Sequence, residues 1–299
     1  MRTVVTGGAG FIGSHLVDAL VERGDDVTVL DDVSTGLRAN IAPDARLIVA
    51  SVTDPDAVAD AVAGAEVVFH LAALGAVARS VADPIATNRA NAEGTLNVLL
   101  QARDVGARRL VFASSSSVYG GAQELPTSES APTRPRSPYA VSKLAAEWHC
   151  RVFSELFELE TVILRYFNVF GPRQRHDAAY AAVMPRFASA LLDGKRPIVY
   201  GDGLQSRDFT YVSDVVTAIT RAKQAAGEKN VLVHGAAVTQ LALSAGVLDE
   251  LELHVIPVLL GHGRRLFDNL SPEHIELERT RILVGDDGVT HMHCRVKRQ

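Results

Sequence analysis

The sequence predicts an α/β protein built on a parallel, doubly wound sheet. Its first residues, RTVVTG, form a short apolar run that leads into a glycine-rich turn and then a helix-like segment through about residue 23. Further strand-like runs alternate with helix-like runs along the chain, as they do in parallel sheets. With 299 residues, 47% of them hydrophobic and 22% charged, the chain has the composition of an ordinary globular protein and ample material for a core.

The first strand, turn and helix predict a dinucleotide site of the Rossmann type. Gly7, Gly10 and Gly13 fall in TGGAGFIGS at 6–14, where a helix N-terminus presents free N–H groups to a pyrophosphate and glycines permit close approach. A second strand, DVTVLDD at 26–32, ends in an acid about 18 residues after Gly13, from which a carboxylate can bond ribose hydroxyls. Asp31 would repel a 2′-phosphate, so NAD is favoured over NADP, although Arg38 is an opposing signal.

The rest of the first 171 residues continues the alternation of strands and helices. Strands are expected at 45–52, 65–73, 108–120 and 159–171. Helices are expected between them, at DPDAVADAVAG, at about 88–105 and at about 138–157, where Ser137 and Pro138 form a suitable helix start. Ligands of such sheets bind outside the carboxyl ends of the strands. Ser115, the stretch from His70 to Ala73 and the glycine turn should therefore converge on one crevice.

The run YAVSK places Tyr139 and Lys143 four residues apart, about 24 residues after Ser115. On a helix this spacing puts both side chains on one face, so the ammonium is expected to lower the phenol pKa and make Tyr139 a base near neutral pH. The Ser115 hydroxyl would share the reacting oxygen of the substrate. A tyrosine and lysine at this spacing occur by chance on many exposed helices, but here their order after a dinucleotide turn favours a nicotinamide-dependent active site.

Charge and cysteine usage exclude several classes of function. The net charge of −5 argues against a nucleic-acid partner, and no apolar run reaches the roughly 18 residues that span a membrane. The chain opens on a strand, not on a secretory leader, and Cys150 and Cys294 are far apart, so a reducing cytoplasm is expected. His291 and His293 would share a strand face without an evident third ligand. No metal site is therefore expected.

Over about residues 1–222 the chain resembles the extended short-chain dehydrogenase/reductase family, in particular NAD-dependent epimerases/dehydratases of the UDP-glucose 4-epimerase type. The motifs that carry the resemblance are TGGAGFIGSH, HLAA, NAEGTLNVL, SSSSVYG, SPYAVSK, LRYFNVFGPRQ and VYGDGLQSRDFTYVSDVV. It implies bound NAD, a nucleotide-sugar substrate, and epimerisation through transient hydride transfer and a 4-keto sugar. It also implies a homodimer, for which the helices at 88–105 and 138–157 are the candidate surfaces.

The resemblance assigns roles to individual residues. Tyr139 is the implied base, Lys143 contacts the nicotinamide ribose, and Ser115 contacts the 4-hydroxyl of the sugar. Asn168 and Arg207 would hold the nucleotide-sugar, the arginine as a charge-assisted partner of its diphosphate. The residues expected to contact NAD are Gly7, Gly10, Phe11, Ile12, Gly13, Asp31, Asp32, Ser51, Val52, Leu71, Ala72, Ala73, Tyr139, Lys143 and Phe167.

Two features separate this chain from other branches of the resemblance. Dehydratases and decarboxylases carry acids just after the catalytic serine or threonine, which they use to expel or remove groups near C5 and C6, whereas this chain has Ser116 and Ser117. Epimerisation is therefore favoured. Ser51 replaces the acid that usually contacts the adenine amino group, which weakens the expected NAD contact.

A boundary is expected near 223–230, where the sequence changes character. Of the seventeen aromatic residues only Phe267 follows position 225. The last residues, with VLVHGAA, PVLLGHGRRLF and a closing hairpin around GDDG, resemble the end of the dihydrofolate-reductase-like domain of riboflavin-biosynthesis deaminase-reductases. The expected domains are thus an NAD-binding domain at 1–224, with a truncated substrate lobe, and a partial reductase-like α/β segment at 229–299.

Three functional hypotheses follow. The first is an NAD-dependent nucleotide-sugar 4-epimerase whose appended segment replaces the missing lobe. The second is a fusion product that folds and binds NAD without turnover. The third, a reductase that uses NADPH, is disfavoured because Ala236 follows Gly235 where that family carries two glycines, and a methyl group opposes close approach of a phosphate.

Overall fold

A computed structural model describes residues 1–121, 127–175, 182–199, 201–203, 207, 209–224, 250–255, 275–284 and 290–297. The chain forms two compact units. The first comprises Met1–Ala122 and Glu129–Asn230, and the second comprises Gln123–Ser128 and Val231–Gln299. The domain limits expected from the sequence, 1–224 and 229–299, stay predictions.

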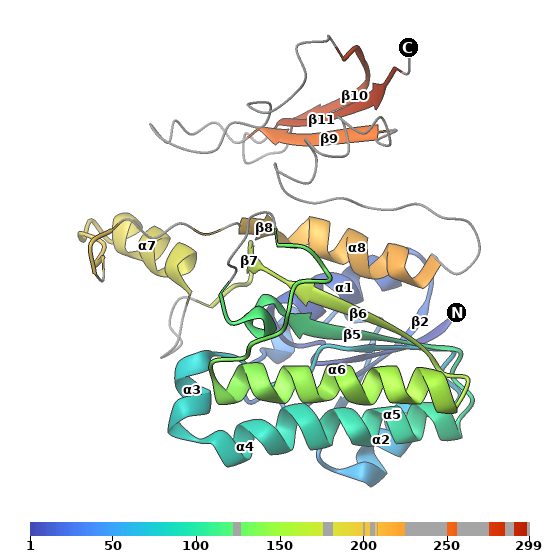
Figure 1. The fold of residues 1–299 in the computed structure, drawn as a ribbon. Coiled ribbons are helices and arrows are strands. Elements are labelled where there is room, and N and C mark those ends of the chain that lie inside the picture. Colours follow the sequence, from blue (N-terminus) through green and yellow to red (C-terminus); the bar gives the residue numbers. More distant parts are fainter. Residues whose placement is uncertain are drawn as a thin grey trace. The chain divides into compact units, whose positions relative to one another are not determined.

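The first unit is built on a six-stranded parallel sheet in the order β3-β2-β1-β4-β5-β6 (Figure 1). The strands are β1 (Arg2–Thr6), β2 (Asp26–Asp31), β3 (Arg46–Val49), β4 (Val67–His70), β5 (Arg109–Ser115) and β6 (Glu160–Tyr166). The order reverses between β1 and β4, which creates the crevice at the carboxyl ends where α/β proteins bind ligands. The predicted doubly wound α/β fold is confirmed.

Helices cover both faces of this sheet. The helices of the first unit are α1 (Phe11–Glu22), α2 (Pro55–Val62), α3 (Val77–Ala82), α4 (Pro84–Asn88), α5 (Gly94–Asp104), α6 (Pro138–Leu156), α7 (Val183–Leu192) and α8 (Val212–Gln224). One core cluster joins the sheet to α2, α5 and α6, and the other joins it to α1 and α8. Adjacent strand residues such as Val4 and Val5 belong to opposite clusters, because successive side chains of a strand point to opposite faces.

The helix expected at 88–105 is interrupted by a π-helical turn at Arg89–Glu93 before α5 begins. Within this turn the Asn91 side chain bonds both backbone groups of Leu74, by accepting from its N–H at 2.8 Å and donating to its carbonyl at 3.3 Å. π-Turns often occur where a helix must deliver a particular side chain. Hydrophobic periodicity does not reveal such a turn, because it changes the hydrogen-bond register without changing the apolar pattern.

The four strands expected at 45–52, 65–73, 108–120 and 159–171 are all shorter than the apolar runs that predicted them, and the last two runs change structure at their ends. The run at 108–120 ends as β5 at Ser115 and continues as a 3₁₀ turn over Ser116–Tyr119. The run at 159–171 divides into β6 and a separate strand, β7 (Asn168–Phe170), which pairs in parallel with β8 (Phe209–Tyr211). Both breaks lie at the carboxyl edge of the sheet, where the chain turns away to form the site.

In the second unit the described residues form a three-stranded antiparallel sheet in the order β10-β11-β9. Its strands are β9 (Glu250–Val255), β10 (Leu277–Val284) and β11 (Thr290–Val296). The predicted closing hairpin is present as β10 and β11, while its GDDG turn and the Gly235-Ala236 pair lie outside the described residues. Among the helices of the described ranges, none combines the length and apolar character needed to cross a bilayer.

Candidate active site

The glycine turn between β1 and α1 has the shape of a phosphate-binding loop. Gly7 has a φ of +74°, and its N–H donates to the Leu30 carbonyl at 2.8 Å. A Cβ at Gly7 would lie 2.6 Å from the backbone nitrogen of Ala72, and a Cβ at Gly13 would collide with the Gly7 carbonyl oxygen. Both positions therefore need glycine, so that the helix, the first strand and the loop after β4 approach one another closely.

Asp31, at the end of β2, lies where a ribose-binding acid is expected. Its carboxylate accepts hydrogen bonds from the N–H groups of Ala9, at 2.9 Å, and Val33, at 2.8 Å. Burial raises the pKa of Asp31, and these two donors oppose the rise. An ionised carboxylate offers about four lone-pair sites, so two donors leave capacity for ribose hydroxyls.

The neighbouring predicted contacts are placed at the same edge. Asp32 is exposed and accepts from the backbone and hydroxyl of Ser34, at 2.9 and 2.6 Å. The Ser51 hydroxyl is 2.9 Å from that of Thr53, and Val52 is buried with its carbonyl bonded by Asn97. Ser51 thus shapes its own loop, and a hydroxyl supplies only part of the adenine contact that an acid would make.

A buried polar chain fixes the loop after β4, which contains Leu71, Ala72 and Ala73. The Thr6 hydroxyl accepts from the Ala72 N–H at 3.2 Å and lies 2.6 Å from His70 Nδ1. On the other side of the ring, Nε2 lies 2.9 Å from the Thr95 hydroxyl, which donates to the Asn91 carbonyl at 2.5 Å.

These donors and acceptors assign the tautomer of His70. Because the Thr95 hydroxyl donates its single hydrogen to the Asn91 carbonyl, it must accept from Nε2–H of His70. Nδ1 then accepts from the Thr6 hydroxyl. Burial, and secondarily the charge of Lys143, lowers the pKa of His70 to about 3, so the ring is neutral. His70 therefore serves to position the loop, not to exchange protons.

Tyr139 lies on α6 and Ser115 at the end of β5, and their shared catalytic role stays a prediction. Ser137 caps α6 by accepting from the Ala140 N–H at 3.1 Å, which places Tyr139 in the first turn. The Ser115 side chain lies close enough to the Tyr139 phenol to lower its pKa. Asn91 reaches the same turn, since its side chain donates to Ser142, whose hydroxyl donates to the Tyr139 carbonyl.

The expected lowering of the Tyr139 pKa by Lys143 is not what the structure shows. Burial raises the pKa of Tyr139, and the Ser115 hydrogen bond opposes that rise. The Lys143 ammonium donates to the Ala113 carbonyl at 2.9 Å and lies 4.9 Å from the centre of the Phe112 ring. Sequence spacing gives the shared helix face but not the depth of burial, and here burial decides the direction.

The pKa of Lys143 also departs from its ordinary value. It is only 2% exposed, and burial lowers its pKa to about 8, while Cys150 and Glu147 oppose the change. Sequence reasoning overlooked Glu147, although it continues the i, i+4 series of Tyr139 and Lys143. Glu147 accepts from the Ser114 hydroxyl at 2.5 Å and pairs with Arg165, so it ties α6 to the strand end that carries Ser115.

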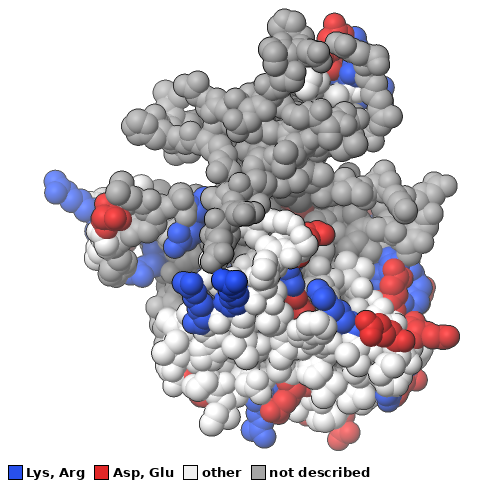
Figure 2. Space-filling view, in the orientation of Figure 1, with Lys and Arg blue, Asp and Glu red and all other residues white. Residues whose placement is uncertain are grey.

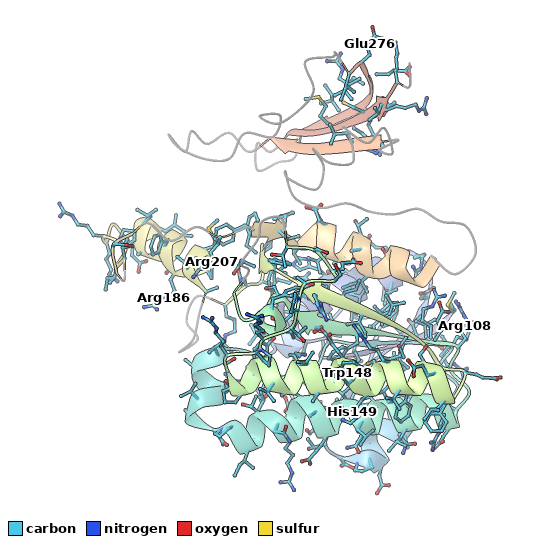
Figure 3. The ribbon with its side chains drawn as sticks, in the orientation of Figure 1. Arg108, Trp148, His149, Arg186, Arg207 and Glu276 are labelled. Atoms are coloured by element: carbon cyan, nitrogen blue, oxygen red, sulfur yellow. The ribbon has the colours of Figure 1, made fainter. Side chains whose placement is uncertain are left out.

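The predicted substrate residues lie at the same end of the unit. Phe167 follows β6 and stacks on Tyr119 with ring centroids 6.4 Å apart. Asn168 begins β7 and pairs with Phe209, two residues after Arg207. Arg207, and Arg186 on α7, lie at the end of the sheet toward which β5 and β6 point (Figure 3). The contacts that these residues make with a cofactor or a sugar stay predictions.

Comparison with known proteins identifies the family of this site. Residues 3–234 match the model of the NAD dependent epimerase/dehydratase family. The chain belongs to this family. Its cofactor is accordingly NAD, and residues 202–291 separately match the RibD C-terminal domain. Both sequence resemblances are therefore confirmed.

Curated relatives of this epimerase/dehydratase have several activities. A putative UDP-glucose 4-epimerase of Methanocaldococcus jannaschii is 42% identical over 72% of this chain and 71% of its own length. UDP-glucose 4-epimerase of Mycolicibacterium smegmatis is 40% identical over 89% and 88%. A UDP-N-acetyl-alpha-D-glucosaminuronate decarboxylase of Bacillus cytotoxicus is 41% identical over 73% and 69%. These relatives are named for different reactions on UDP-sugars, so their names do not select one reaction for this chain.

Solved structures of sugar-nucleotide epimerases and dehydratases are similar to this chain in fold and sequence. UDP-glucose 4-epimerase of Thermotoga maritima, with UDP-glucose, superposes with a TM-score of 0.73 at 37% identity, covering 74% of this chain and 73% of that one. A dTDP-glucose 4,6-dehydratase of Streptomyces venezuelae with NAD bound gives 0.68 at 35% identity, covering 73% and 70%.

The geometry of the glycine turn and of the residues around it fits NAD. A helix N-terminus leaves its first N–H groups without intrahelical acceptors, and α1 begins after Gly10, which has no side chain to cap them. Glycines let the backbone of this turn pack closely on itself and on the loop after β4, and Asp31 retains acceptor capacity at the end of β2. The turn would take the pyrophosphate, Asp31 the adenosine ribose, and Lys143 the nicotinamide ribose.

Proposed function

We propose that this chain is a nucleotide-sugar 4-epimerase of the UDP-glucose/UDP-galactose type. The observation that carries the proposal is the placement of Ser115 at the end of β5 beside the first turns of α6, which carry Tyr139 and Lys143, in a site without an acid at position 116 or 117. Expulsion of the 6-hydroxyl or loss of a carboxylate needs further acid–base groups near C5 and C6. Serine hydroxyls do not titrate in the range such steps require.

Each residue has one role in this mechanism. Bound NAD supplies reversible hydride acceptance at C4 of the sugar. Tyr139 takes the proton of the 4-hydroxyl and returns it once the 4-keto sugar has turned over, so no net redox change results. Ser115 hydrogen-bonds the same sugar oxygen, and Lys143 contacts the nicotinamide ribose. Asn168 and Arg207 bind the nucleotide-sugar, the latter through its diphosphate.

We also propose that the active form is a homodimer. α6 exposes Val141, Trp148 and Val152 on one stripe, at spacings of seven and four residues. A broad uncharged area covers the face on which α6 lies, and Trp148 projects from that helix (Figures 2 and 3). A second copy would cover this apolar stripe. Light scattering should give a dimer that Trp148→Glu converts to a monomer.

The reaction is tested on the full-length protein with its NAD content measured first. UDP-glucose or UDP-galactose should produce the other epimer, with a transient rise in NADH absorbance. Tyr139→Phe should keep NAD and lose both signals. Tyr166→Phe is the matched control, because within the described residues the buried Tyr166 hydroxyl has no hydrogen-bond partner.

Two outcomes would reject the proposal. Protein that carries NAD but gives neither NADH nor epimer would support a fusion product without turnover. Release of a 4-keto-6-deoxy sugar would instead support a dehydratase.

A further inference from the structure

The hydroxyl of Ser115 accepts hydrogen bonds from Ser117, two residues later in the chain. Ser117 donates twice to the Ser115 oxygen, from its backbone N–H at 3.2 Å and from its own hydroxyl at 2.9 Å. The neighbouring Ser116 makes neither of these hydrogen bonds. Ser115 also lowers the pKa of the nearby Tyr139 phenol.

The capacity of a hydroxyl group decides how Ser115 can act on its other neighbours. A serine oxygen has two acceptor sites and one hydrogen. Because Ser117 fills both acceptor sites, only the single hydrogen of Ser115 is left for a further partner. Ser115 can therefore act on the phenol oxygen of Tyr139 only as a donor, the direction in which a hydrogen bond favours the phenolate.

The local backbone makes this arrangement rigid. Ser115 caps the 3₁₀ turn over Ser116–Tyr119, whose Val118 and Tyr119 are buried. The turn ends at Gly120 with a φ of +69°, and a Cβ there would collide with the Arg134 carbonyl. Arg134 in turn donates its N–H to the Val118 carbonyl at 2.9 Å. Ser117 is thus fixed by its own turn.

We propose that Ser117 is a positioning residue that makes the Ser115 hydroxyl a hydrogen-bond donor only, so that the sugar 4-hydroxyl passes its proton directly to Tyr139. The O–H bond of the sugar breaks and the phenolate oxygen gains the proton, while the single hydrogen of Ser115 turns from the phenol to the oxygen left on C4. A proton relay through Ser115 would require a free acceptor site on its oxygen. This inference rests on the proposed epimerase function for its kinetic consequence, but the two hydrogen bonds from Ser117 to Ser115 stand without it.

The test compares Ser117→Ala, Ser117→Thr and Ser116→Ala in the full-length, NAD-loaded protein. Alanine at 117 keeps the backbone donor and removes only the hydroxyl, whereas threonine restores it. Ser117→Ala should lower kcat about tenfold, the effect of one hydrogen bond in the transition state, with KM unchanged. Ser117→Thr should recover most of that loss, and Ser116→Ala should match the parent protein.

A second measurement does not depend on turnover. The ionisation of Tyr139 is obtained from the ultraviolet difference titration of each variant against the same variant carrying Tyr139→Phe. Ser117→Ala should raise the midpoint by about one pH unit, since Ser115 can then rotate away from the phenol. If no epimer forms but the midpoint shifts, the positioning role holds and the proposed function fails.

Two results would overturn the inference. One is a Ser117→Ala variant whose midpoint and kcat equal those of Ser116→Ala. The other is a Ser115→Ala/Ser117→Ala double variant that is slower than Ser115→Ala, because a residue that acts only through Ser115 adds nothing once Ser115 is gone.

Discussion

Arg165 donates two hydrogen bonds to Glu147, from Nε to Oε1 at 2.9 Å and from Nη2 to Oε2 at 2.7 Å. The carboxylate is 1% exposed and also accepts from Ser114, so one buried anion joins β5, β6 and α6. The guanidinium lies over the Tyr119 ring, with its carbon 4.7 Å from the ring centre. This ion pair fixes the strand end that carries Ser115 against the helix that carries Tyr139 and Lys143.

Glu147→Gln should destabilise the protein strongly. The substitution leaves the Arg165 cation without its anion in a largely buried place, which typically costs about 3–5 kcal/mol. Urea unfolding followed by far-ultraviolet circular dichroism measures the loss. Glu155→Gln, at an exposed position of the same helix, is the matched control. Equal midpoints for the two variants would show that the ion pair contributes nothing.

Gly13→Ala should abolish NAD binding. Its Cβ would press on the Gly7 carbonyl, a backbone atom that can yield only if the turn opens. Gly75→Ala is the control, because a Cβ there meets no atom within 4 Å. We expect purified Gly13→Ala to lack NAD. The free energy of unfolding of Gly75→Ala should lie within about 0.5 kcal/mol of the parent value. Retention of NAD by Gly13→Ala would contradict the proposed turn.

His70 should make the first unit sensitive to acid. Its folded pKa of about 3 lies below the ordinary 6.5, so the unfolded chain binds the proton first. The stability tied to neutral His70 is complete above pH 6.5 and is lost as the pH falls toward 3. Between pH 7 and pH 5 the loss is about 2 kcal/mol.

This sensitivity is measured by comparing urea unfolding of the parent and of His70→Asn at both pH values. The asparagine variant should be less stable at pH 7, because the bonds to Thr6 and Thr95 are disrupted, but its stability should fall less at pH 5. An identical fall in both proteins would assign the acid sensitivity to other groups.

Lys143→Met should stabilise the NAD-free protein at neutral pH. Replacing a buried charge with an apolar chain of similar length is often neutral or stabilising by about 1–4 kcal/mol. The folded pKa of about 8 lies below the ordinary 10.5, so the parent gains stability as the pH rises from about 8 toward 10.5. The methionine variant should lack this rise. A variant less stable than the parent at pH 7 would contradict the cost assigned to the buried ammonium.

Local patterns in the sequence predicted much of the fold and the members of the candidate site. Alternation of apolar strands with amphipathic helices predicts the parallel sheet, because each element must bury an apolar face. The spacing of the glycines at 7, 10 and 13 predicts the turn. The positions of Ser115, Tyr139 and Lys143 at the carboxyl edge follow from the order of strands, which brings distant segments to one crevice.

Other properties of the site required the folded chain. The π-turn around Asn91, the tautomer of His70 and the pairing of Glu147 with Arg165 depend on which polar atoms meet across the sheet, and spacing does not encode those meetings. The direction of the Tyr139 pKa was wrong in the sequence analysis, because solvation of a phenol is set by what covers it. In the sequence Ser117 indicates only the absence of an acid, whereas in the folded chain its hydroxyl donates to Ser115.

The sequence by itself thus determined which elements form and which residues reach the crevice, since periodicity and turn chemistry act over a few neighbouring residues. Tertiary structure decided how those residues are charged and which way their hydrogens point. Burial and hydrogen-bond capacity are properties of a packed neighbourhood, and that neighbourhood is assembled from β1, β4, β5, β6 and α6, which lie far apart in the chain.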